Sequence, residues 1–227
     1  LENDDVAIEA VSGASAGAVN AAVLAYGHLI GGREGARVAL DRFWSTVSEK
    51  SLAGASRSAF PEPATKTYLS LTRYFSPYQL NPLNLNPLRD ILVDTVDFDR
   101  VRHCHKTQLF IAATQVRTGA LRVFDQSTLN ADMVMASACL PLMFQAVEID
   151  GEGYWDGGYA GNPSLMPLIT ESLADDLLLV QINPIEREAV PTSANDHHVI
   201  RRLEPAACPE RLPVTPTRES CAQQAPG

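Results

Sequence analysis

The sequence lacks the features that mark nucleic-acid-binding and membrane-spanning chains. Its 18 lysines and arginines stand against 27 acidic residues, which gives a formal net charge of −9. Arg201-Arg202 is the only basic doublet, and a chain this acidic would repel a phosphate backbone. No apolar run approaches the roughly 18 residues that a transmembrane helix needs. We therefore exclude nucleic acid as a main partner and expect no membrane span.

Metal-binding patterns are equally scarce. The four cysteines form no CxxC pair and show no zinc-ligand spacing. A His103-Cys104-His105 triplet could bind a metal ion, but no further ligands lie near it in the sequence. Isolated thiols suit a reducing compartment. We expect a cytoplasmic protein that uses neither a metal nor a cofactor.

The sequence does contain strand-like runs that alternate with helix-like segments. The expected strands are 6–13, 108–116, 120–125, two short pieces within 146–163, and a buried strand at 175–183. The expected helices are 14–30, 35–47, one that begins at Pro87, and 131–144 cut off by Pro141, with a loop at 51–65. This alternation predicts an α/β fold, a three-layer sandwich whose mostly parallel or mixed sheet has helices on both faces.

The C-terminal residues differ in composition from the rest. The last 23 residues, "PAACPERLPVTPTRESCAQQAPG", hold five prolines and little apolar periodicity. Such a composition is typical of a segment without its own core. We expect one domain over residues 1–190 and a flexible, proline-rich tail over 191–227.

One short motif carries the strongest chemical signal. In "VSGASAGAV" a single hydroxyl, Ser15, lies between Gly13 and Gly17, after a predicted strand and before a predicted helix. A Gly-x-Ser-x-Gly turn in that context lifts a serine above the edge of a sheet, and side chains at either glycine would collide with the strand or helix. Ser15 is therefore a candidate nucleophile, and the competing interpretation is a simple helix N-cap.

A serine hydroxyl needs a base to accept its proton. His28 lies near the far end of the helix that follows Ser15, roughly 20 Å away at 1.5 Å per residue. His103 and His105 lie in a polar connection. His197 and His198 follow in the order expected of a Ser-His-Asp hydrolase, but they lie at the start of the predicted tail. A carboxylate is the better candidate: Asp156 precedes Gly157 and Gly158 in "GYWDGGYAGNPS".

Together the two motifs resemble the patatin-like phospholipase family, whose Ser-Asp dyad uses a Gly-x-Ser-x-Gly elbow and a distant Asp-Gly-Gly. The segments "SPYQLNPLNLNPLRDIL", "ATQVRTGALRVF" and "ASACLPLMFQAVEIDGEGYWDGG" are also similar to bacterial members. The likeness extends over about residues 6–190. It implies that Ser15 is the nucleophile, that Asp156 is the general base, and that the substrate is a lipid or another carboxylic ester. Such a substrate would be met in the cytoplasm or at a membrane or lipid surface.

The likeness also implies a segment that the sequence does not contain. In the family a glycine-rich loop after the first strand forms the oxyanion hole, ahead of the serine elbow. Fourteen residues precede Ser15 and none forms such a loop, so we expect the domain to be incomplete at its N-terminus. Two other interpretations stay open. One is a catalytically impaired fragment or a lipid- or protein-binding pseudoenzyme, and the other is a Ser-His-Asp hydrolase that uses His197 or His198.

Overall fold

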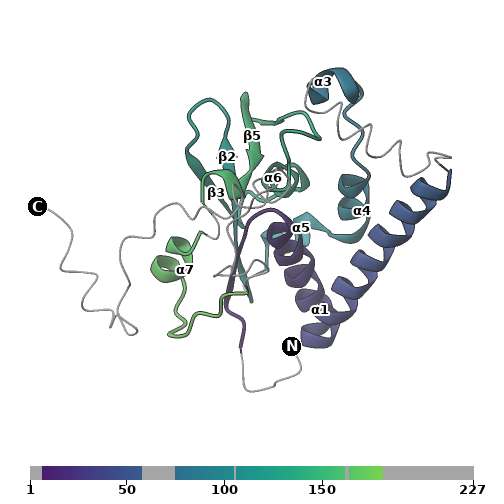
Figure 1. Cartoon of the computed structure of the whole chain (residues 1–227). Helices are drawn as coiled ribbons and strands as arrows, with labels where there is room; N and C mark the ends of the chain where they lie inside the picture. Colours follow the sequence, from purple (N-terminus) through teal and green to yellow (C-terminus); the bar gives the residue numbers. More distant parts are fainter. Residues whose placement is uncertain (1–6, 58–74, 105, 162–163, 181–227) are drawn as a thin grey trace, which may run out of the picture. The chain divides into compact units, whose positions relative to one another are not determined.

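The computed structural model describes residues 7–57, 75–104, 106–161 and 164–180 (Figure 1). Within these residues lies a single mixed sheet. It is built from β1 (Ala10–Gly13), β2 (Gln108–Gln115), β3 (Leu121–Asp125), β4 (Val147–Ile149) and β5 (Glu152–Asp156). The β1 strand pairs with β2 in parallel, and the other pairings are antiparallel. The mixed α/β sheet predicted from the sequence is confirmed.

The β2 strand organises this sheet because it pairs with three others. The β3 strand occupies one edge of β2, with Phe110 opposite Asp125 and Thr114 opposite Leu121. A strand has two edges, so β1 and β5 share the other edge, one after the other. The β1 strand covers residues 108–111 of β2 and β5 covers residues 113–115. Because β5 is antiparallel to β2 and β1 is parallel to it, β1 and β5 run toward each other and end at the same place.

The segment after β1 is helical from Ala16 to Arg57 (α1). Gly31 and Gly32 have non-helical backbone angles, so α1 consists of two helices joined by a kink. The break predicted between 14–30 and 35–47 is therefore confirmed. The predicted loop at 51–65 is wrong for its first seven residues, which continue the helix; no proline interrupts the chain before Pro61. Residues 58–65 lie outside the described ranges.

The remaining helices are short. They are α3 (Pro77–Leu80), α4 (Pro87–Thr95), α5 (Phe98–Arg102), α6 (Ala131–Ser137) and α7 (Met166–Glu171), with a 3₁₀ turn at Gly157–Tyr159. The α4 helix begins at the predicted Pro87, where the Asn86 side chain accepts a hydrogen bond from the Leu88 N–H. The α6 helix ends at Ser137, earlier than predicted from Pro141, since a proline has no N–H to donate to the carbonyl four residues before it and its ring clashes with that carbonyl.

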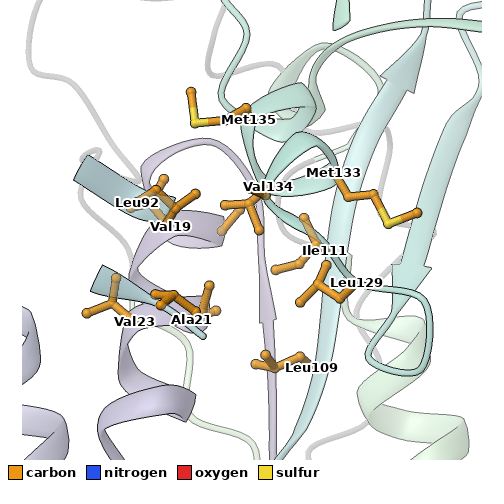
Figure 2. Packing of buried hydrophobic residues seen from close by; sticks show 14 of the residues in the cluster. Val19, Ala21, Val23, Leu92, Leu109, Ile111, Leu129, Met133, Val134 and Met135 are labelled. Carbon is orange, nitrogen blue, oxygen red and sulfur yellow. The ribbon is translucent and has the colours of Figure 1, made fainter. Parts of the chain in front are cut away.

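An apolar cluster joins α1, α4 and α6 to one face of the sheet. Figure 2 shows its central side chains, which include Val19 and Val23 of α1, Leu92 of α4, and Leu109 and Ile111 of β2. All five are buried. Val11 of β1 packs against the same cluster. Its neighbour Ser12 points to the opposite face, where its Oγ donates to the Ser164 carbonyl in the segment that leads to α7. The cluster anchors the strand and the helix on either side of Ser15.

The buried strand predicted at 175–183 is not present in its described part. Residues 175–180 are irregular, and Leu178 and Val180 are 84% and 82% exposed. Among the described residues no strand pairs with this run, so its backbone has no ladder to join. An apolar run alone does not specify a strand partner. Residues 181–183, like the predicted tail at 191–227, lie outside the described residues.

Candidate active site

Ser15 occupies a strained turn between β1 and α1. Its φ of 56° lies in the left-handed region, which costs a non-glycine residue about 1–2 kcal/mol. Its backbone N–H donates to both the carbonyl (3.1 Å) and the Oγ (3.0 Å) of Ser137 at the end of α6. Such strain persists only where the surroundings hold it, and it gathers at functional sites. The backbone therefore has the geometry of a nucleophile elbow, while the role of Ser15 stays a prediction.

The two glycines of the motif have different steric surroundings. A Cβ atom added to Gly13 would lie 2.4 Å from the Gly17 carbonyl oxygen, because the first turn of α1 folds back over the end of β1. A Cβ atom added to Gly17 would meet nothing within 4 Å. The expectation that both positions exclude a side chain is therefore wrong for Gly17, which lies on a less crowded part of the turn.

This difference predicts opposite outcomes for two alanine substitutions. Gly13→Ala forces the helix away from the strand, and we expect it to lower the free energy of unfolding by more than about 2 kcal/mol. Gly17→Ala places alanine at an open helical position, so the change should stay within about 0.5 kcal/mol or be stabilising. Urea denaturation of both variants measures the difference. Equal losses at the two positions would contradict the packing described here.

Asp156 ends β5, and hydrogen bonds of its side chain and of its backbone hold it there. Its Oδ1 accepts from the Gly158 N–H (2.8 Å), its N–H donates to the Cys139 carbonyl (2.9 Å), and its carbonyl accepts from Thr114 Oγ1 (2.8 Å). The residue is 3% exposed. A Cβ atom on Gly157 would lie 2.1 Å from the Ala112 carbonyl oxygen. The Asp-Gly-Gly motif is thus a capped turn that packs directly against β2.

The sheet brings the two motifs to one place. Gly13 lies opposite Ile111 and Asp156 lies opposite Ala113 on the shared edge of β2. Ile111 and Ala113 are about 7 Å apart along the strand. The Cβ position of Gly157 lies 3.2 Å from the Ala14 Cβ atom. The residue before Ser15 and the residue after Asp156 are therefore neighbours, although 143 positions of sequence separate Ala14 from Gly157.

The end of α6 contacts both candidate residues. Ser137 binds the N–H of Ser15, and Cys139 binds the N–H of Asp156. Burial raises the pKa of the Cys139 thiol to about 11, and the nearby Asp156 carboxylate acts in the same direction. The thiol donates to the Gln145 carbonyl. Sequence reasoning did not single out Ser137 or Cys139, because a buried serine and a lone cysteine carry no motif.

A cavity of about 310 Å³ adjoins Cys139. Its walls come from α4, α6, β4 and the connections beside them. The lining side chains include the polar Asn84, Asn86, Arg89 and Glu148 and the apolar Met135 and Phe144. Cys139 lines this cavity and its carbonyl accepts from the Asp156 N–H, so a single residue links the cavity to the aspartate.

The histidines that the structure describes lie away from Ser15. The His28 ring lies 3.1 Å from Thr107 Oγ1, just before β2 begins and about 20 Å along that strand from the site. His103 Nδ1 lies 2.7 Å from the Asp99 carbonyl. His105, His197 and His198 fall outside the described residues. In the described part of the chain no group of three His, Cys, Asp or Glu side chains could hold a metal ion, and no helix is long and apolar enough to cross a membrane.

A comparison with protein families gave a match over most of the chain. The model of a family described as patatin-like phospholipase matches residues 1–169. That range includes both glycine-flanked motifs and all five strands of the sheet. A comparison with curated proteins gave no match.

Proposed function

Because the chain belongs to the patatin-like phospholipase family, we propose that it hydrolyses carboxylic esters of lipids through Ser15 and Asp156. The family is one of lipid acyl hydrolases. The observation that carries the dyad is the meeting of the Ser15 elbow and the buried Asp156 at one edge of β2. A strained serine and a buried carboxylate in one place are what a serine–aspartate mechanism requires.

In this mechanism Asp156 accepts the proton of the Ser15 hydroxyl while Oγ attacks the ester carbonyl carbon. The tetrahedral intermediate expels the alcohol, which takes the proton from Asp156, and an acyl group remains on Ser15. Water then attacks the acyl carbon and gives a proton to Asp156, and that proton returns to Ser15 as the carboxylic acid leaves. The bonds formed and broken and the protons moved in each step belong only to the two side chains, the ester and water.

The oxyanion formed during attack requires hydrogen-bond donors. The N–H of Ser15 is committed to Ser137, so we assign none of this role to it. Ala16 follows at the exposed N-terminus of α1, where the helix dipole favours negative charge, and the N–H after a nucleophile is a frequent donor. From the resemblance we expect a glycine-rich loop to supply a second donor.

We also propose that the protein works in the cytoplasm or peripherally at a membrane or lipid surface. Two loops beside the cavity support contact with lipid. Gln145 Nε2 donates to the Asn81 carbonyl and thereby ties the loops together. The exposed apolar side chains here are Tyr78 of α3, Leu83 and Leu85 between α3 and α4, and Leu142 and Met143 between α6 and β4. Exposed apolar side chains gathered on linked loops suit an interface with lipid.

The proposal is tested by incubating the purified chain with a fluorophosphonate and mapping the adduct by peptide mass spectrometry. Fatty-acid release from phosphatidylcholine vesicles and from a soluble ester is measured in parallel. We expect a single adduct on Ser15 and release of acid from at least one substrate, with no adduct on heat-unfolded chain. A folded chain that forms no adduct would instead favour the lipid- or protein-binding pseudoenzyme.

A further inference from the structure

Ser137 is a fully buried residue whose hydroxyl makes two hydrogen bonds. It is the last residue of α6 and is 0% exposed. Its Oγ donates to the Ala112 carbonyl of β2 (2.6 Å) and accepts from the Ser15 N–H (3.0 Å). A hydroxyl has one proton to donate. The bond to Ala112 uses that proton, so the oxygen meets the Ser15 N–H as an acceptor.

The Ser137 hydroxyl thus links the Ser15 N–H to the Ala112 carbonyl, which also contacts the turn that follows Asp156. The Ala112 carbonyl oxygen is the atom that the Gly157 backbone approaches so closely that no Cβ is tolerated there. Through Ser137 the elbow is tied to that carbonyl, and through Gly157 the Asp-Gly-Gly turn rests on it. Two residues later, the Cys139 carbonyl accepts from the Asp156 N–H. The end of α6 and the two residues after it thus contact both motifs.

The Ser15 backbone needs such a contact because its φ of 56° is unfavourable for serine. Without the Ser137 hydroxyl, the Ser15 N–H would keep only the Ser137 carbonyl as acceptor, and the end of α6 would lose its bond to the Ala112 carbonyl. The turn could then relax toward ordinary helical angles and extend α1 backwards. That change would move Oγ away from the aspartate even if the sheet and the core stayed intact. Misplacement by about 1 Å can cost a factor of about 10² in rate.

We propose that Ser137 is a positioning residue that holds Ser15 at the height and angle required for attack. The inference rests on the proposed function. Ser137 acts through the backbone of Ser15 and the carbonyl of Ala112, and it does not contact the reacting atoms. Its removal should slow the chemical step and leave ligand binding nearly unchanged.

The test compares wild type, Ser137→Ala, Ser137→Cys and the control Thr107→Val in their reaction with a fluorophosphonate. The control removes a hydroxyl that is just as buried, 1% exposed and hydrogen-bonded to His28, but at the other end of β2. Reaction rates over a range of probe concentrations separate the maximal inactivation rate from the concentration for half-maximal rate. We expect the maximal rate to fall about 10²-fold in Ser137→Ala, with the half-maximal concentration within twofold of wild type. Thr107→Val should react at the wild-type rate.

The outcomes separate the two proposals. A folded wild type that forms no adduct at Ser15 overturns the proposed function. A labelled wild type with Ser137→Ala reacting equally fast overturns the positioning role, as does an equal loss in Thr107→Val. If Ser137→Ala does not fold, Ser137→Cys answers the question by the same criteria, because a thiol fills nearly the same space but is a weak hydrogen-bonding group.

Discussion

Ser15→Ala is expected to abolish fluorophosphonate labelling and to lower ester turnover by a factor on the order of 10⁶. The reason is that no other group in the proposed site can form the acyl intermediate. The fold should survive, because the contact that holds residue 15 is made by its backbone N–H, and not by its side chain. Circular dichroism and urea denaturation of the variant check the fold, and active-site labelling checks the chemistry.

A second substitution at the same position separates chemistry from strain. Ser15→Gly also removes the nucleophile, but glycine adopts a φ of 56° without steric cost. Ser15→Gly should therefore be inactive and at least as stable as Ser15→Ala, with a difference of about 1 kcal/mol. Residual turnover at the wild-type level in either variant would show that another group is the nucleophile.

Each half of the candidate site could be proposed from the sequence because it is a local motif. Gly13 and Gly157 each lie within two residues of a candidate side chain, and close backbone approaches require both glycines. Such requirements leave a recognisable pattern in the chain. That the two halves meet depends on β1 and β5 sharing one edge of β2. Only the likeness to a family supplied that pairing in advance.

Other features depend on contacts that no local pattern records. Ser137 looks like any small residue in "MASACLP", and its importance comes from Ala112 and Ser15, which are distant in sequence. The run at 175–180 failed as a strand for the same reason. Its hydrophobicity is real, but a strand also needs a neighbour to which its backbone can bond. A sequence pattern indicates which conformations a segment can adopt, whereas its contacts with other segments decide which one it adopts.

Asp156→Asn is expected to lower ester turnover by about 10²–10⁴-fold, the usual contribution of a general base. The substitution changes the ability of the side chain to take a proton and little else. Oδ1 of the aspartate accepts from the Gly158 N–H, and an asparagine oxygen can accept the same bond, since asparagine and aspartate are about equally good caps. The turn should therefore remain while the ability to take a proton is lost.

A matched control is Asp97→Asn. Asp97 also caps a helical turn, by accepting from the Arg100 N–H at the start of α5. Its replacement should leave both stability and turnover close to wild type, within about 0.5 kcal/mol and twofold. A loss confined to Asp156→Asn then reports on proton transfer and not on capping.

The same assay decides between the dyad and the Ser-His-Asp alternative. A variant with both His197→Ala and His198→Ala should keep wild-type turnover if Asp156 accepts the serine proton directly. If instead the double variant is inactive and Asp156→Asn keeps most of its activity, a histidine is the base and the dyad is wrong. Loss in both variants would require the histidine to lie between Ser15 and Asp156, as in a triad.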